Sequence, residues 1–181
     1  MVREHGKADN LIRPAMEKDR DDVLEIFNFY AEQGFAAYPD SPVPPAFYSI
    51  LAEEALAFLV LEENGEVIGF SVLRPFLPFK AFSRTGTVST FISGPSRSHG
   101  YGSMIYKEIE KEAGRRGIVH LLVNISSLNP ESLSFHKTRG FAECGRFHEV
   151  GSKWGQDFDM IWMEKRIHTC SEHNLPIEEK P

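Results

Sequence analysis

One segment of the chain combines glycines, an arginine and small polar residues in a spacing that suits the binding of a phosphate. It reads Arg97-Ser98-His99-Gly100-Tyr101-Gly102-Ser103 and lies between a β-branched stretch and a helical pattern. Small residues let the backbone approach a ligand closely. The first N–H groups of a helix are unpaired and lie at the positive end of its dipole. The segment therefore predicts a cradle for a diphosphate.

Two familiar phosphate-binding motifs do not match this segment. No Lys-Ser or Lys-Thr pair follows the glycines, which excludes a P-loop. The three-glycine dinucleotide fingerprint is absent too, and the elements before the segment are a helix pair and a hairpin. Taken alone, Gly100-x-Gly102 fits an ordinary turn from a strand into a helix equally well.

The elements that must position this turn follow from hydrophobic periodicity and turn signals. Val23, Ile26, Phe27 and Tyr30 share one face of a helix predicted over residues 17–32. Asn64-Gly65 marks a tight hairpin between strands. The predicted strands cover residues 11–14, 58–61, 67–73, 85–92, 118–125, 141–150 and 158–166, and the other helices cover 46–54, 100–116 and 130–139. The order β-α-α-β-β-β-α-β-α-β-β predicts a mixed α/β sheet with helices on both faces, and parallel strands with right-handed crossovers in its later part.

Length and composition indicate one folded domain. The chain has 181 residues, of which 41% are hydrophobic and 25% charged, as in ordinary globular proteins. We expect a single domain over residues 10–167, a flexible N-terminus at 1–9 and a disordered polar tail at 168–181. His168, Cys170 and His173 in that tail offer only three metal ligands without a fourth, so we predict no metal site.

Charge and apolar runs bear on the partners. Acidic residues outnumber basic ones by 26 to 20, a net charge of −6, which disfavours a nucleic-acid-binding protein. No apolar run approaches the roughly 20 residues of a membrane-spanning helix, and the polar N-terminus lacks a signal-peptide pattern. With only two cysteines, the sequence favours a cytoplasmic protein that binds neither membrane nor nucleic acid.

The phosphate cradle gains specificity from its place after the fourth strand. Arg97-x-x-Gly100-x-Gly102 resembles the acyl-CoA signature, Arg/Gln-x-x-Gly-x-Gly/Ala, of the GNAT N-acetyltransferase superfamily. Asn129-x-x-Ser132-x-x-Phe135-His136-x-x-x-Gly140-Phe141 resembles its Asn-x-x-Ala-x-x-Phe-Tyr-x-x-x-Gly-Phe segment. The resemblance extends over residues 10–167 and implies a GNAT-like acyl-CoA N-acyltransferase fold.

Within the superfamily, the chain is most similar to the phosphinothricin acetyltransferase group. Residues 151–159, Gly-Ser-Lys-Trp-Gly-Gln-Asp-Phe-Asp, resemble that group's stretch before the last strand, and His136 stands where the group usually has histidine. Two positions depart from the group's pattern. Thr87 takes the place of a glutamate that acts as a base through water, and Asp157 takes the place of a tryptophan.

The resemblance implies acetyl-CoA as the cofactor and direct attack by an amine. The pyrophosphate would lie on the amides of residues 98–103 beside Arg97, and the pantetheine arm along Thr90, Phe91 and Ile92. A backbone N–H near Phe91 would stabilise the oxyanion. The remaining cofactor contacts would come from Asn129, Ser132, His136 and Lys137, with Arg139 as a second candidate for the 3′-phosphate.

The catalytic positions implied by the resemblance are His136 and Thr87. His136 would protonate the leaving thiolate, or would only pack against the cofactor. Thr87 cannot remove a proton near neutral pH, so the base is another carboxylate, His120 or water. We therefore expect positioning to carry most of the rate.

The acceptor would be the amine of a small molecule, such as an amino acid or a phosphinothricin-like analogue. Candidate residues for its pocket are Phe35, Tyr38, Phe76 and Phe82, for which packing is an equally good explanation, and Lys80 and Lys153 for a carboxylate. The family also implies a homodimer. Two other functions stay open: a catalytically weak acyl-CoA-binding protein, and an acetyltransferase of protein N-termini.

Overall fold

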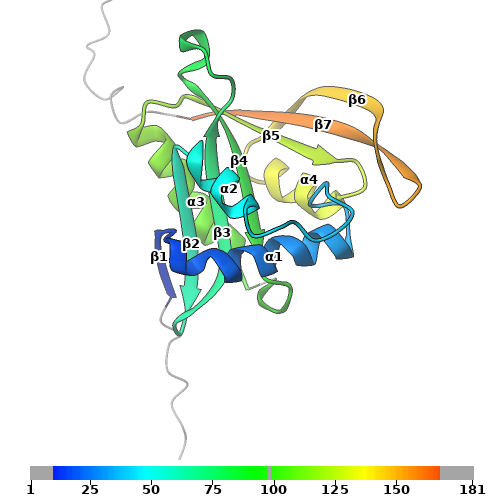
Figure 1. Ribbon diagram of the computed structural model, residues 1–181. Helices are drawn as coiled ribbons and strands as arrows, with labels where there is room; N and C mark the ends of the chain where they lie inside the picture. The colour runs from blue at the N-terminus through cyan, green and yellow to red at the C-terminus, as the bar shows by residue number, and fades with distance from the viewer. Residues whose placement is uncertain (1–9, 98, 168–181) are drawn as a thin grey trace, which may run out of the picture.

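The molecule is built on one mixed seven-stranded sheet, seen in a computed structural model that describes residues 10–97 and 99–167 (Figure 1). The strand order is β1-β2-β3-β4-β5-β7-β6. The strands are β1 (Asn10–Pro14), β2 (Ala57–Glu63), β3 (Glu66–Pro75), β4 (Thr85–Ile92), β5 (His120–Ser126), β6 (Ala142–Lys153) and β7 (Gln156–Arg166). The helices are α1 (Arg20–Gln33), α2 (Phe47–Glu53), α3 (Tyr101–Arg115) and α4 (Pro130–Lys137). The predicted order of elements is confirmed. The terminal predictions for 1–9 and 168–181, including the possible metal ligands there, lie outside the described residues.

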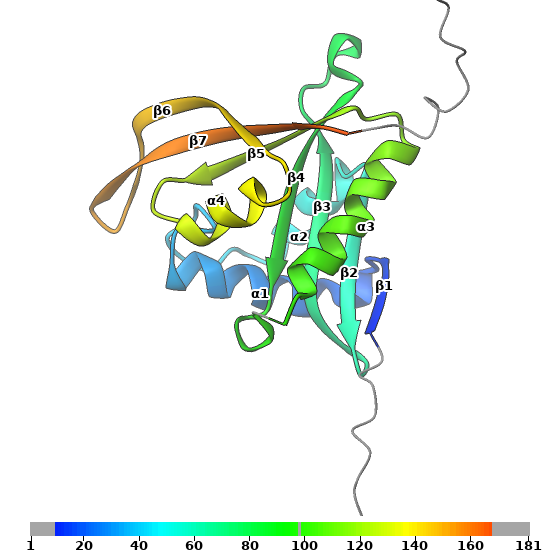
Figure 2. The ribbon, with the colours of Figure 1, turned by 180° about the vertical axis from the view of Figure 1, so that it is seen from behind.

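Helices cover both faces of the sheet, as predicted. Helices α1 and α2 lie on one face and α3 and α4 on the other (Figures 1 and 2). Val23 and Phe27 of α1 pack with Phe70 of β3 in the first core. Ile105 and Ile109 of α3 pack in the second core, against side chains of β2 to β5 and β7. Among the described residues, no helix is long and apolar enough to cross a membrane.

The start of α1 differs by three residues from the prediction because Asp19 has other partners. Residues 17–19 form a 3-10 turn, in which Asp19 accepts a hydrogen bond from the Met16 N–H at 2.8 Å. Arg13 binds both oxygens of Asp19, at 2.6 and 2.9 Å, and also Glu62 of β2. The guanidinium beside it holds the pKa of Asp19 below its usual range. This network ties the first strand to the first helix.

The sheet changes character between β4 and β5. These strands are parallel, but only three residue pairs join them: Thr85 with His120, Gly86 with Leu121, and Thr87 with Leu122. Beyond Thr87 the two strands diverge (Figure 2). On its other edge β5 pairs with antiparallel β7, so β7 lies between β5 and β6. The predicted crossover between neighbouring parallel strands is therefore found for β4-α3-β5. It is not found for β5-α4-β6, because β7 separates these two strands.

The closing hairpin extends further than predicted. Its turn is Trp154-Gly155, where both residues have positive φ (53° and 75°), as a two-residue hairpin turn requires. The polar run Gly151-Ser152-Lys153 reads as a loop in the sequence, yet all three residues pair with β7. A Cβ atom at Gly151 would lie 2.2 Å from the Phe158 ring, so this close approach needs glycine.

Candidate active site

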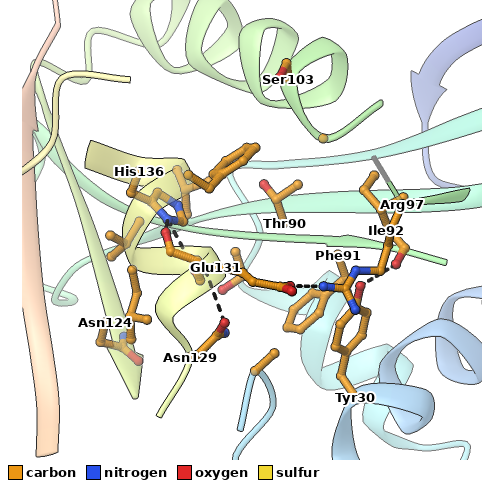
Figure 3. Close-up of a pocket in the computed structure, with 18 of the residues that line it drawn as sticks. Tyr30, Thr90, Phe91, Ile92, Arg97, Ser103, Asn124, Asn129, Glu131 and His136 are labelled. Carbon is orange, nitrogen blue, oxygen red and sulfur yellow. Dashed lines mark hydrogen bonds and ion pairs between the residues drawn. The ribbon is translucent and has the colours of Figure 1, made fainter. Parts of the chain in front are cut away.

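A cavity of about 540 Å³ opens where β4 and β5 diverge (Figure 3). Its walls come from residues 88–92 of β4, residues 123–125 of β5, the turn before α3, and α4. Tyr30 of α1 and Ala36 complete the lining. Most of the residues predicted to bind the cofactor contribute to it: Thr90, Phe91, Ile92, Arg97, Gly100, Gly102, Ser103, Asn129, Ser132 and His136. His99, Tyr101 and Lys137 do not line it, and Ser98 is outside the described residues.

One wall of the cavity is the edge of β4 beyond Thr87, which pairs with no other strand of the described residues on that side. Two hydrogen bonds show which residues of β4 bond to β3. They run from Ser93 N to Ile68 O (2.8 Å) and from Phe76 N to Thr85 O (3.2 Å). Because bonded and non-bonded pairs alternate along an antiparallel ladder, odd-numbered residues of β4 bond to β3. The N–H and C=O groups of Val88, Thr90 and Ile92 therefore face the gap, where an extended ligand can pair with them.

A second wall is the N-terminal turn of α3. Gly100 precedes the helix with φ +84°, a conformation that favours glycine. A Cβ atom on Gly102 would lie 3.2 Å from the Phe135 ring, so α3 and α4 approach closely here. Ser103 N and Met104 N donate to the Gly100 carbonyl at 3.0 and 3.1 Å. The amides of Tyr101 and Gly102 precede these bonds at the start of the helix, which is the end at which helices bind anions.

Arg97 has a partner that the sequence did not predict. It forms an ion pair with Glu131, in the first turn of α4, across the cavity (Figure 3). The acidic residue at that helix start is favoured by the dipole, but nothing in its spacing points to Arg97. A phosphate bound by Arg97 would share the guanidinium with the Glu131 carboxylate or replace that carboxylate.

Asn129 begins α4 as predicted. Its Oδ1 accepts a hydrogen bond from Ser132 N at 3.1 Å, and Pro130 follows at the first helical position. The cap prediction is thus confirmed. It places the Asn129 and Ser132 side chains at the cavity wall.

His136 lies in the cavity wall as a buried, neutral side chain. It is 7% exposed, and its Nδ1 lies 2.8 Å from the Ser132 carbonyl oxygen. Because a carbonyl oxygen only accepts, Nδ1 carries the proton. Burial, with a smaller contribution from Arg139, lowers the pKa of His136 below its ordinary value. Nε2 has no hydrogen-bond partner among residues 10–97 and 99–167, so it presents a lone pair.

Thr87 stands at the point where the gap begins. It pairs with Arg74 on β3 and with Leu122 on β5, and it is half-buried. It does not itself line the cavity. Thr87 is thus the last residue of β4 that pairs with β5, and Arg74 is its cross-strand neighbour on β3.

The four aromatic residues predicted for the acceptor pocket do not line the cavity, and they pack in two groups on β7. Phe35 and Tyr38 pack on Phe158 of β7, at ring distances of 5.8 and 6.0 Å. Phe76 packs on Phe82 and on Trp162 of β7, at 5.7 and 6.0 Å. We call these side chains the aromatic rim: Phe35, Tyr38, Phe76, Phe82, Phe158 and Trp162.

Asn124 connects the aromatic rim to the cavity. It lines the cavity, accepts a hydrogen bond from the Tyr38 hydroxyl at 2.8 Å, and stands opposite Trp162 in the β5–β7 ladder. The sequence analysis missed both Asn124 and Trp162. The one available signal was a polar residue inside the apolar run of residues 118–125.

The lysines predicted to bind a carboxylate lie elsewhere. Lys153 is 3% exposed, and its Nζ donates to the carbonyls of Gly34 (2.6 Å) and Ala37 (2.9 Å). It also lies 4.2 Å from the Trp154 ring. Lys153 therefore fastens the loop after α1 to the β6–β7 hairpin. Lys80 is exposed on the loop between β3 and β4, which projects from the sheet (Figure 1).

Replacing Lys153 by methionine should destabilise the protein by about 1–3 kcal/mol. The variant keeps the length of the side chain but leaves two buried carbonyls without their donor. Urea unfolding measures the change in the free energy of unfolding. Lys111→Met is the matched control, because Lys111 forms an exposed ion pair with Glu108 on the surface of α3, and it should change that free energy by less than about 0.5 kcal/mol. Equal effects of the two substitutions would contradict the role of Lys153.

A comparison with protein families decides the family. The model described as the acetyltransferase (GNAT) family matches residues 23–141. The chain belongs to the GNAT family. It is therefore an acyltransferase, and acetyl-CoA is its cofactor.

Individual relatives agree with the GNAT assignment. An L-methionine sulfoximine/L-methionine sulfone acetyltransferase from Pseudomonas paraeruginosa is 27% identical over 86% of this chain and 94% of the relative. The solved structure of a ribosomal-protein-alanine N-acetyltransferase from Brucella melitensis is 30% identical, covers 87% of this chain and 99% of the other, and has a TM-score of 0.81. The Salmonella typhimurium acetyltransferase yncA, solved with acetyl-CoA, is 26% identical over 87% and 94%, with a TM-score of 0.80. Other curated GNAT relatives are phosphinothricin N-acetyltransferases, which confirms the predicted subgroup resemblance.

The residues of the cavity fit this GNAT cofactor. The open edge of β4 matches an arm that contains amide groups, and the absence of a Cβ at Gly102 leaves the helix end of α3 accessible. Arg97 supplies a positive charge at the same end.

Proposed function

We propose that the protein transfers the acetyl group of acetyl-CoA to the primary amine of a small molecule related to the amino acids, by direct attack. The observation that carries the proposal is the cavity at the divergence of β4 and β5. It has an anion-binding helix end on one side and the aromatic rim on the other. The names of the methionine sulfone and phosphinothricin acetyltransferases support the acceptor class.

The binding steps follow from the walls of the cavity. The amides of Tyr101 and Gly102, with Arg97, hold the pyrophosphate. The groups of the β4 edge that face the gap pair with the pantetheine arm as a neighbouring strand would. The Ile92 carbonyl already accepts a hydrogen bond from the Tyr30 hydroxyl at 2.5 Å, so we place the pairing at Val88 and Thr90. Bound acetyl-CoA supplies an electrophilic thioester carbon.

The chemical step needs a neutral amine next to that carbon. The amine nitrogen forms the new C–N bond, the C–S bond breaks, and the thiolate leaves with the electron pair. The negative charge that develops on the carbonyl oxygen is stabilised by a backbone N–H. Because the N–H of Phe91 faces β3, the donors near it that face the gap are those of Thr90 and Ile92. The proton that the attacking nitrogen carries after forming the C–N bond passes to water. Holding the amine next to the thioester supplies most of the rate.

The pH dependence should follow the amine and not His136. A general acid must be protonated. Because the pKa of His136 is lowered from its ordinary value of about 6.5, the side chain is already mostly neutral at pH 6.5. The neutral fraction of an α-amine rises toward its pKa of about 8. We therefore expect kcat/KM to increase from pH 6.5 to 8 in stopped-flow assays of thiol release.

His136→Phe is the matched variant for this profile. It should reduce turnover severalfold with little change in the Kd of acetyl-CoA, and it should keep the same rising profile. A wild-type rate that falls through this pH range would instead assign His136 as the proton donor. An unchanged rate in His136→Phe would remove it from the mechanism.

The test of the function is an acetylation screen followed by thiol release. The panel contains L-amino acids, L-methionine sulfone, L-methionine sulfoximine, L-phosphinothricin, polyamines and a peptide that begins with alanine. Turnover of an α-amino acid or analogue, identified by mass spectrometry, supports the proposal. Binding of acetyl-CoA without turnover of any amine would favour a catalytically weak acyl-CoA-binding protein. Acetylation of the peptide alone would favour the second candidate function, which is acetylation of protein N-termini. The name of the Brucella relative supports this second candidate.

We also propose that residues 10–167 act as one catalytic domain in a cytoplasmic homodimer. The projecting loop between β3 and β4 exposes Leu77 and Phe79, which are 40% and 64% accessible, and such apolar side chains suit an interface. Cys144 is exposed and has no disulfide partner among the described residues, which suits a reducing compartment. Light scattering of the purified protein tests the dimer.

A further inference from the structure

The side chain of Asn124 occupies a special place in the sheet. Its neighbours Val123 and Ile125 point into the core beneath α3. Since side chains alternate along a strand, Asn124 points to the opposite face, toward the loop after α1. It is the second residue of β5 beyond the last pair with β4, and it lines the cavity (Figure 3). An acceptor that approaches the thioester from the aromatic rim must pass this side chain.

We propose that Asn124 binds the acceptor amine and that Tyr38 is the positioning residue for its carboxamide. The inference rests on the proposed function and adds the residue that holds the amine. The Tyr38 hydroxyl donates to Asn124 Oδ1 at 2.8 Å, which turns the carbonyl oxygen of the amide toward the rim. That oxygen has a second lone pair.

A neutral primary amine matches this arrangement. It has two N–H donors and one lone pair, and the lone pair must point at the thioester carbon. An N–H that donates to Asn124 Oδ1 leaves the lone pair free for attack. An amide does not titrate near neutral pH, so Asn124 binds the amine without removing its proton.

The neighbours of the pair hold both side chains in place. The Tyr38 ring stacks on Phe158 at an interplanar angle of 7°. Trp162 stands directly opposite Asn124 in the ladder, where cross-strand side chains touch, and Phe76 packs on Trp162. These rings provide apolar surface for the body of the acceptor next to the site that holds its amine.

The experiment measures steady-state kinetics with L-methionine sulfone and with 2-phenylethylamine, against acetyl-CoA, in variants of both residues. Asn124→Leu should raise the KM for each amine roughly 3- to 10-fold, the size of one lost hydrogen bond, and leave the KM for acetyl-CoA within twofold. Asn124→Asp retains the accepting oxygen and should keep the amine KM within threefold. If Asp is as harmful as Leu, the amide N–H is what matters and the assignment is overturned.

Tyr38 is tested through Asn124. Tyr38→Phe keeps the ring on Phe158 and should raise the amine KM about 2- to 5-fold, yet add less than twofold in the Asn124→Leu background. Tyr48→Phe is the matched control, because it loses an equivalent hydrogen bond, to Met16 O at 2.7 Å, outside the cavity. It should leave both KM values unchanged. Additive effects of Tyr38→Phe and Asn124→Leu would contradict the positioning role.

The outcomes separate the inference from the proposed function. Binding of each amine to the protein saturated with coenzyme A is measured by calorimetry beside the kinetics. A wild-type protein that neither acetylates nor binds either amine overturns the proposed function for these amines and the assignment with it. An active wild type whose amine KM is unchanged in Asn124→Leu overturns the assignment alone.

Discussion

Replacing Gly102 by valine should weaken the binding of acetyl-CoA at least about 100-fold. The first atom of the new side chain would already lie 3.2 Å from Cε2 of Phe135 and 3.7 Å from Ile92. Phe135 has little room to retreat, because the Arg139 guanidinium lies 3.4 Å from the centre of its ring. The two further methyl groups of valine would therefore push the start of α3 away from α4. The amides of Tyr101 and Gly102 would lose their common direction, and overpacked sites of this kind relax at the expense of local geometry.

Titration calorimetry with acetyl-CoA measures the effect of Gly102→Val. Gly145→Val is the matched control, because Gly145 lies on exposed β6 with no atom within 4 Å of the added Cβ. Its Kd should equal that of the wild type. Circular dichroism shows whether each variant is folded. A folded Gly102→Val variant with wild-type affinity would disprove that the pyrophosphate lies on this helix end.

Replacing Thr87 by glutamate should increase kcat/KM at pH 7 by up to roughly 10-fold. Most of an α-amine with a pKa near 8 is protonated at about pH 7, so a base at the reaction site raises the reactive fraction. Thr87 is the last residue of β4 that pairs with β5, at the mouth of the gap. Arg74, directly opposite on β3, favours the ionised carboxylate.

Thr87→Gln is the matched control for size and polarity. It cannot remove a proton, and its kcat/KM should not exceed that of the wild type. The advantage of Thr87→Glu should shrink as the pH rises from 7 to 9, because the amine then loses its proton to water unaided. Equal activity of the two variants at pH 7 would show that deprotonation does not limit the rate.

What the sequence predicts well in this protein is local. The Asn64-Gly65 turn, the Asn129 cap and the glycine turn before α3 each depend on a few adjacent residues, and the structure has all three. The hydrophobic periodicity of α1 likewise identifies the buried face that contains Val23 and Phe27.

What the sequence does not predict depends on the arrangement of distant segments. Glu131 meets Arg97 only because α4 packs beside α3. Lys153 is buried only because its strand passes under the loop after α1. Asn124 gains Trp162 as a neighbour because β7 inserts beside β5. Strand order is set by the packing of the whole sheet, and no residue spacing in this chain encodes it.

The narrow junction between β4 and β5 links stability to ligand binding. Three residue pairs form the whole β4–β5 ladder, and the Arg84 carbonyl beside it accepts from the N–H groups of Val119 and His120. A ligand that pairs with β4 takes the place of a neighbouring strand at this junction. Its binding therefore also stabilises the contact between the two parts of the sheet. By mass action, saturation at 100 times Kd adds about 2.7 kcal/mol to the free energy of unfolding. Bound acetyl-CoA would thus stabilise the fold as well as serve the reaction.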